Sequence, residues 1–414
     1  MSDRRTPSSG ANVRRAMRSA GRQAFKTAST PMLAAARASG LFGLARGFAH
    51  PDEALAALDP TNVQGLVVDL AEPPRPLTTL GAGDRPPTLG PVTTTVTILD
   101  ATRGALRFCN NLVVDDRDWI VFPRDTDEDR RRFKFRDLRP WRTPLDHSRR
   151  VSGSVAYLSN TGVHNFGHWL LFVFPLVQHY REYLGQEPDY FYVGNPIQEW
   201  HYDSLAELGI VRDRVLADAV VGDRMLAAIA ERPTPSPTRF LDFSTGALRR
   251  AHDPSTSSRR IFISRKLRPT RSLLNEEECI EVLERHGFQS YCTETLTLRE
   301  EAELFANAEA VVALHGAGLA NLVLCHPGCV VVELFAHDFT STWFAHVSAV
   351  RKLTYASLHG AATTTRGLPG KHHNVLIDPD QLDSVLAAAT QAAKDRPGHD
   401  GVDVLGRTRA AELD

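Results

Sequence analysis

Residues 311–335, VVALHGAGLANLVLCHPGCVVVELF, give the clearest indication of the fold of this chain. The β-branched apolar residues at the start predict a buried strand, and the glycine-rich loop HGAG at 315–318 ends it. Helix-compatible residues follow at 319–324, then a Pro-Gly stop and a second apolar run at 330–332. Strand, loop, helix and strand in this order form one unit of a parallel sheet.

The loop at 315–318 has the composition of an anion site. Glycine at a strand-to-helix turn lets backbone N–H groups approach a ligand, and the helix N-terminus behind it favours negative charge. Glu333 follows His315 by 18 positions, about the separation at which nucleotide-binding units keep the acid that holds a ribose. However, the pattern G-x-G-x-x-N, from Gly316 to Asn321, lacks the third glycine of the dinucleotide fingerprint. The loop is therefore compatible with phosphate binding or with a turn without a ligand, and His315 with a phosphate donor or a core histidine.

The composition is that of an ordinary globular protein. The 414 residues suffice for two to three domains, 42% of them are hydrophobic, and the net charge is −1. This balance gives no reason to expect nucleic acid as a partner. The five cysteines are odd in number and lack zinc spacing, so we expect reduced, buried side chains in a cytoplasmic protein.

Positive charge is concentrated in residues 1–50, which carry nine Arg or Lys and one acid, a net charge of +8 against −9 for the rest. Apolar residues between the basic ones permit an amphipathic helix that contacts an anionic membrane peripherally. The alternative is a solvated basic tail. Arg37 and Arg46 interrupt every candidate signal-peptide core, and the longest apolar run, 169–177, is too short to span a bilayer.

Strand and helix patterns alternate along most of the chain, which predicts an α/β fold of two Rossmann-like lobes facing a cleft. Residues 71–92 are dense in Pro and Gly and predict a linker, and antiparallel strands are predicted from 93 to 124. Prolines between 233 and 237 mark the boundary between the lobes. The predicted parts are the basic segment 1–50, an N-terminal lobe 51–235, a C-terminal lobe 236–375, and a C-terminal helix and tail 376–414.

A basic cluster, SRKLRPTR at 264–271, directly follows a predicted strand at 260–264. Ligands of open α/β sheets bind beyond the carboxyl ends of the strands, where this cluster and the HGAG loop would both lie. Guanidinium groups offer fork-shaped donors that match phosphate oxygens. We therefore predict a diphosphate site at this edge, and the alternative is a solvated run of charge.

The segment NFGHW at 165–169 is a second candidate site, at the start of a predicted helix. Asn165 is suited to cap this helix. His164 and His168 lie four positions apart, but no third ligand and no H-E-x-x-H glutamate accompany them, which argues against zinc. Imidazole titrates near neutral pH, so His168 is either a general base in the cleft or a core histidine. Two D-x-D pairs, at 125–127 and 378–380, have the surroundings of surface turns, and no metal is expected.

Three segments together resemble glycosyltransferase family 61: NFGHWLL at 165–171, SRK…R with NEEE at 264–278, and HGAGLANL…PG…VVEL at 315–334. This family includes bacterial capsular-polysaccharide enzymes, plant xylan-decorating transferases and eukaryotic O-linked GlcNAc transferases. The resemblance covers roughly residues 150–360. It implies inverting, metal-independent transfer of a sugar from a nucleotide-sugar donor to a glycan hydroxyl, without a cofactor. It also implies the two-lobed GT-B arrangement, with the donor on the C-terminal lobe.

The resemblance gives the motifs roles by position. The residues expected to bind the diphosphate are Arg265, Lys266, Arg271, His315, Gly316, Ala317, Gly318, Leu319 and Asn321. Asn165 and His164 would lie on the acceptor side, His168 would be the base, and Glu333 would hold the ribose or serve the structure.

One position departs from the family pattern. Phe172 stands where we expect an acid after HWLL, so either His168 deprotonates the acceptor or the activity is altered. In the latter case the protein would bind a glycan or a nucleotide within a polysaccharide assembly system. An esterase, suggested by H-G-x-G, would need a G-x-S-x-G nucleophile elbow, which the sequence lacks.

Overall fold

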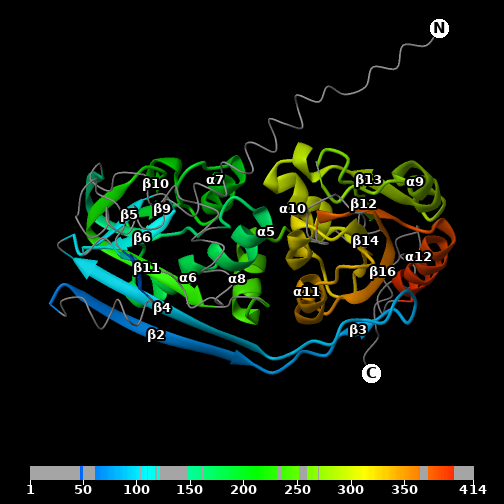
Figure 1. Ribbon diagram of the computed structural model, residues 1–414, viewed down its shortest axis with the longest axis horizontal. Helices are drawn as coiled ribbons and strands as arrows, with labels where there is room; N and C mark the ends of the chain where they lie inside the picture. The colour runs from blue at the N-terminus through cyan, green and yellow to red at the C-terminus, as the bar shows by residue number, and fades with distance from the viewer. Residues whose placement is uncertain are drawn as a thin grey trace, which may run out of the picture.

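The computed structural model describes residues 47–49, 61–102, 104–109, 111–116, 119–121, 148–160, 162–231, 235–250, 259–268, 270–363 and 372–395. The predicted basic segment 1–50 lies outside the described residues, apart from the short strand β1 (Gly47–Ala49). The D-x-D pair at 125–127 lies outside them as well. The membrane contact predicted for the basic segment therefore stays a prediction. The described residues form two sheets, side by side in Figure 1, with helices around and between them.

The second sheet carries the parallel strands that the HGAG segment predicts. Its order is β13 (Phe288–Tyr291), β12 (Arg259–Ile263), β14 (Ala308–Leu314), β15 (Val330–Ala336) and β16 (Thr354–Thr363). These five strands are all parallel, and β17 (Asn374–Leu376) joins β16 in antiparallel pairing. Counted in chain order, the parallel strands run 2-1-3-4-5. The order reverses between β12 and β14, and sheets of this type bind ligands beyond the carboxyl ends of the strands at such a reversal.

Helices cover both faces of this sheet, because the side chains of each strand alternate between two cores. In β14, Val311 and Ala313 pack in the core that includes α10 (Leu298–Ala306), the 3-10 helix η4 (Ala317–Leu324) and α11 (Trp343–Arg351). Val312 and Leu314 pack in the core with α9 (Glu276–Arg285) and α12 (Pro379–Lys394). The predicted doubly wound sheet is thus confirmed for this part of the chain.

The first sheet has ten strands and is mixed. Its parallel part consists of β11 (Val220–Glu231), β8 (Arg149–Tyr157), β9 (Tyr190–Tyr192) and β10 (Val215–Leu216). On the other side of β11, β4 (Val92–Thr102) and β5 (Leu106–Cys109) run antiparallel. The remaining strands are β2 (Val63–Glu72), β6 (Leu112–Asp115), β7 (Trp119–Val121) and β1. The predicted antiparallel strands from 93 to 124 are therefore confirmed where described, and only the four parallel strands are Rossmann-like.

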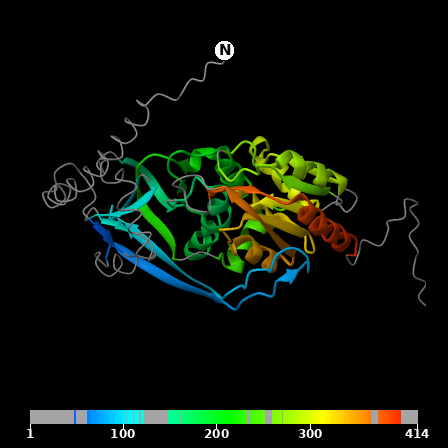
Figure 2. The same cartoon turned by 45° about the vertical axis from the view of Figure 1, so that its right-hand side comes forward.

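Residues 71–92, predicted to be a linker, connect the two sheets in both directions. After β2 the chain crosses to the second sheet, where β3 (Thr78–Thr79) pairs with β16, and it returns as β4. The Asp84 carboxylate accepts hydrogen bonds from the backbone N–H of His359, at 2.6 Å, and from its ring, at 2.8 Å. Figures 1 and 2 show this excursion along one side of the molecule. The proline and glycine content of residues 71–92 predicts a linker, but the segment forms hydrogen bonds with residues that lie far away in sequence.

The helix predicted from 167 begins at Phe166 and is irregular. It consists of α5 (Phe166–His168), the π-helical turn η1 (Trp169–Val173) and α6 (Leu176–Leu184). Pro175 has no N–H to donate to the preceding turn, and the N–H of Phe174 bonds the carbonyl of Trp169. The carbonyls of Leu170 and Leu171 accept instead from the hydroxyls of Ser244 and Ser236. The turn therefore packs tightly against α8 (Thr238–Leu248).

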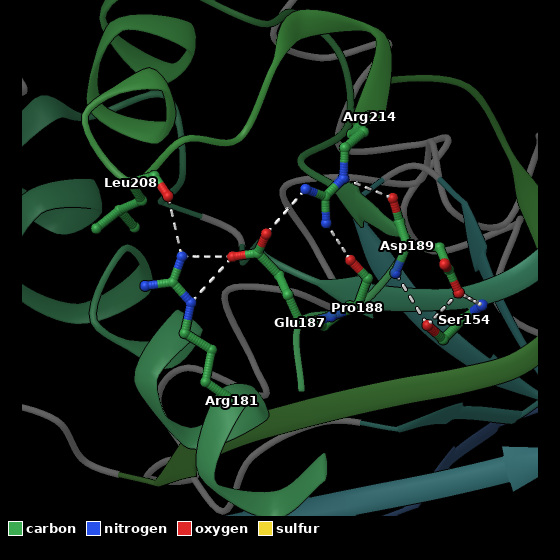
Figure 3. Close-up of polar contacts among 7 residues, drawn as sticks. All are labelled: Ser154, Arg181, Glu187, Pro188, Asp189, Leu208 and Arg214. Carbon is green, nitrogen blue, oxygen red and sulfur yellow. Dashed lines mark hydrogen bonds and ion pairs between the residues drawn. The ribbon is translucent and has the colours of Figure 1, made fainter. Parts of the chain in front are cut away.

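An ion-pair cluster between α6 and β9 shows how half-buried arginines are neutralised in this protein (Figure 3). Glu187 accepts from Arg181 Nε at 3.0 Å and from Arg214 Nη1 at 2.8 Å. Arg181 also donates to the carbonyl of Leu208, and Arg214 to that of Asp189. Each guanidinium therefore has a carboxylate and a carbonyl as partners, as partly buried charges require.

The five cysteines and Asp378 of the second D-x-D pair have the surroundings of structural residues. The cysteines form no disulfide in the described part of the chain, and all except Cys292 are buried. Asp378 caps α12 by accepting from Asp380 N at 2.9 Å. No group of three His, Cys, Asp or Glu among the described residues is arranged to hold a metal ion. Of the described helices, none has both the length and the apolar character needed to cross a bilayer. The cytoplasmic location stays a prediction.

Candidate functional site

A pocket of about 910 Å³ lies between the two sheets. One wall consists of residues that follow β12, β13 and β14, at the carboxyl ends of these strands. The other wall consists of residues 162–166 and of the start of α7 (Glu199–Ala206). The pocket thus opens where the strand order of the second sheet reverses, which is the position expected for a ligand.

Two predicted arginines form the cationic part of the pocket. Arg265 donates from Nε to the carbonyl of Arg271 at 3.3 Å and from Nη2 to the carbonyl of Thr270 at 3.4 Å. Arg271 has a left-handed backbone, with φ 57°, and its Nη1 donates to the carbonyl of His315 at 2.9 Å. These bonds join the loop after β12 to the loop after β14. They hold two guanidinium groups close together despite their repulsion.

Neither of these guanidinium groups has a carboxylate partner within the described residues, whereas their neighbour Arg268 pairs with Glu294. Burial lowers the pKa of Arg265 to about 10, and the charges of Arg271 and Arg268 contribute to this shift. Burial also lowers the pKa of Arg271, with a contribution from Arg268. Both remain cationic at neutral pH, and a half-buried charge without an ion-pair partner is costly. An anion that enters the pocket therefore gains two charge-assisted partners.

The glycine loop lies against these arginines. A Cβ at Gly316 would collide with Nη1 of Arg265, so the absence of a side chain permits the close approach. The helix that follows, η4, is a 3-10 helix and begins at Ala317. The predicted residues that line the pocket are His164, Asn165, Arg265, Arg271, Gly316, Ala317, Gly318 and Leu319. The structure therefore brings most of the two predicted clusters to one pocket.

His315 and Glu333 do not line the pocket. The His315 side chain is surrounded by three phenylalanine rings and does not line this pocket. Its Nδ1 is 2.6 Å from Oε1 of Glu333, and the hydroxyl of Tyr355 donates to Oε2 at 2.7 Å. Glu333 is fully buried. Of the two roles predicted for Glu333, its contacts therefore favour the structural one.

Three other predicted residues are also absent from the pocket lining. Lys266 is exposed, and Asn321 is buried and donates to Glu301. The ring of His168 packs edge-on against the ring of Phe172, with the centroids 5.6 Å apart. The roles assigned to Lys266, Asn321 and His168 stay predictions.

The pocket also contains residues that the sequence analysis does not assign. Glu294 and Glu301 line the wall of the second sheet, and Glu199, Trp200 and Asp203 line the facing wall. Burial raises the pKa of Glu301 to about 7. Burial raises the pKa of Asp203, and the charge of Glu199 adds to this effect. In the sequence, these residues are marked only by their positions: they lie near the starts of helices, and each of these helices follows a strand.

The fold and the pocket define an α/β protein with a pocket that contains two arginines at a topological switch point. Residues 166–332 match the family model described as Glycosyltransferase 61. This part of the chain carries a domain of glycosyltransferase family 61. The matched residues run from α5 into β15, and so contribute to both walls of the pocket.

Similarity beyond this family is low. No curated protein matches the sequence. Among solved structures, a mutant of the flavo di-iron protein from Thermotoga maritima is 8% identical, with a TM-score of 0.23. This similarity covers 73% of the present chain and 64% of the flavo di-iron protein. The present chain therefore spans less than two thirds of the length of that protein. A TM-score this low supports no conclusion about fold or function.

Proposed function

We propose that this protein transfers a sugar from a nucleotide-sugar donor to a hydroxyl of a glycan or polysaccharide. The observation that carries this proposal is the pair Arg265 and Arg271, half-buried at the switch point, neither of which forms an ion pair with a carboxylate among the described residues. A pyrophosphate group supplies the negative charge that this pair lacks, and guanidinium groups bind it in fixed geometry. The match of residues 166–332 to the Glycosyltransferase 61 family model supports the same activity.

The proposed reaction is a direct displacement that inverts the anomeric centre. A bond forms between the acceptor oxygen and the anomeric carbon while the bond from that carbon to the diphosphate oxygen breaks. The acceptor proton passes to a base, and the negative charge that develops on the diphosphate is stabilised by the two arginines. We propose that no metal is needed for this step. The position of the pocket between the two sheets supports a GT-B arrangement, with the donor on the second sheet and the acceptor on the first.

The base in this scheme should lie on the wall that faces the arginines. His164, Glu199 and Asp203 are the described titratable residues that line this wall. Nε2 of His164 lies 3.1 Å from Nδ2 of Asn111, an amide donor that occupies its lone pair. Glu199 forms an ion pair with Arg212. We therefore propose Asp203 as the base, since burial raises its pKa and with it its affinity for a proton.

Replacing Asp203 by asparagine is expected to lower kcat about 100-fold or more, because an amide cannot accept the acceptor proton. The affinity for a nucleoside diphosphate should not change, since Asp203 lies on the opposite wall. Kinetics of transfer to a glycan acceptor and calorimetry with the diphosphate measure the two effects. His168→Ala is the comparison: a large loss of kcat in that variant, with D203N active, would assign the base to His168.

Thermal unfolding with a panel of nucleotide sugars and nucleoside diphosphates tests the proposed function. In the presence of EDTA, at least one donor and its diphosphate should raise the Tm, because a ligand at 100 times its Kd adds about 2.7 kcal/mol to stability. Failure of the whole panel to stabilise the protein would contradict the donor site. Stabilisation without transfer to any acceptor would favour the alternative suggested by Phe172, a binding protein with altered activity in polysaccharide assembly.

A further inference from the structure

The pocket continues from the arginine pair toward β13. Its lining includes Thr293, Thr297 and Glu301, which follow β13, whereas Glu333 in β15 does not line it. Strand β13 lies next to β12 at the end of the parallel order, on the side away from β14. A ligand with its diphosphate between β12 and β14 would therefore extend over the carboxyl end of β13.

Glu301 is the buried acid in this part of the pocket. It lies in the first turns of α10 and is 9% exposed. Its Oε2 accepts from Nδ2 of Asn321, and within the described residues it forms no ion pair. The other acid that follows β13, Glu294, pairs with Arg268. Of these two carboxylates, Glu301 is thus the one available to a ligand.

Asn321 holds the carboxylate of Glu301 in place through a hydrogen bond. It is fully buried in η4, and its amide group directs one oxygen of Glu301. Its own Oδ1 is buried without a hydrogen-bond partner among the described residues. Burial raises the pKa of Glu301 to about 7, as expected for a buried carboxylate that forms no ion pair within the described residues.

We propose that Glu301 holds the nucleoside of the donor by accepting hydrogen bonds from the ribose hydroxyls, with Asn321 as the residue that positions its carboxylate. This inference rests on the proposed function. In dinucleotide-binding sheets an acid near the end of the second strand holds the ribose, and β13 is second in chain order here. In this proposal Glu301 has the ribose-binding role that the separation of 18 residues from His315 suggested for Glu333. The pocket volume, about 910 Å³, lies within the range of sites for molecules of this size.

Calorimetry with three kinds of probe tests this proposal on the full chain. The probes are ADP, CDP, GDP and UDP, their 2′-deoxy counterparts, and inorganic pyrophosphate. The wild type should bind at least one ribonucleoside diphosphate about tenfold more tightly than the deoxy form. In Glu301→Gln the affinity for that ribonucleoside diphosphate should fall tenfold or more, its preference over the deoxy form should shrink, and the affinity for pyrophosphate should stay within about twofold.

Glu303→Gln is the matched control, since Glu303 is exposed on the same helix and pairs with Arg299. It should bind every probe as the wild type does. An unchanged ribonucleoside affinity and preference in E301Q would overturn the role of Glu301 and leave the diphosphate site intact. A wild type that binds neither pyrophosphate nor any nucleoside diphosphate would overturn the proposed function as well. The comparison of ribo and deoxy probes on the wild type needs no variant, so it holds even if E301Q folds poorly.

Discussion

Replacing Arg265 by alanine is expected to weaken binding of nucleoside diphosphates at least 100-fold. Each hydrogen bond to a charged group contributes about 1.5–3 kcal/mol, and Arg265 is placed to donate more than one to a pyrophosphate. Removing it also removes the donor that lies against Gly316, where the glycine loop meets the ligand. Isothermal titration calorimetry measures the effect directly.

The same variant should keep or gain stability in the absence of a ligand. Arg265 is a half-buried cation beside Arg271, and within the described residues it forms no ion pair with a carboxylate, so its removal relieves repulsion. Unfolding in urea therefore separates loss of binding from loss of folding. Arg268→Ala is the matched control, because Arg268 is more exposed and pairs with Glu294, and its loss should cost only a few-fold in affinity. Unchanged affinity in R265A would contradict the donor site.

Replacing Glu333 by alanine is expected to lower the free energy of unfolding by about 3 kcal/mol. The substitution leaves Nδ1 of His315 and the hydroxyl of Tyr355 without their acceptor in a buried site. It also opens a cavity, because Glu333 is fully buried between β14 and β16. Denaturation in urea at neutral pH measures the change.

Two milder substitutions show whether these hydrogen bonds cause the loss. Tyr355→Phe removes one bond and should cost about 1 kcal/mol, and Glu333→Gln, which can still accept from His315, should cost less than Glu333→Ala. Diphosphate binding should weaken in E333A as well, because His315 leads into the loop that lines the pocket. If E333A unfolded like the wild type and lost only its preference for ribonucleotides, Glu333 would be the ribose-binding residue.

The candidate site could be predicted in part because its two clusters each directly follow a strand. Arg265 comes two residues after β12, and Gly316 two residues after β14. The carboxyl ends of parallel strands meet at one edge of a sheet, so both clusters could be assigned to that edge before their distance was known. The structure places Arg265 and Arg271 of the first cluster and residues 316–318 of the second at one pocket.

The direction of side chains could not be predicted in the same way. His315 belongs to the same loop as Gly316, yet its ring turns into the core and contacts Glu333. Glu301 lies on a helix of ordinary surface composition, and only the packing of that helix brings its carboxylate into the pocket. The separation of 18 residues between His315 and Glu333 likewise does not show that these two side chains contact each other and that neither lines the pocket.

The units of strand, glycine loop and helix can be read from local sequence patterns, because side-chain alternation, helix signals and glycine conformations are properties of neighbouring residues. Three other relations appear only in the folded chain: β13 lies beside β12, residues 71–92 reach across to β16, and Glu301 and Asp203 line one pocket. These relations depend on packing between segments far apart in the chain, and no local pattern encodes which strand becomes the neighbour of another.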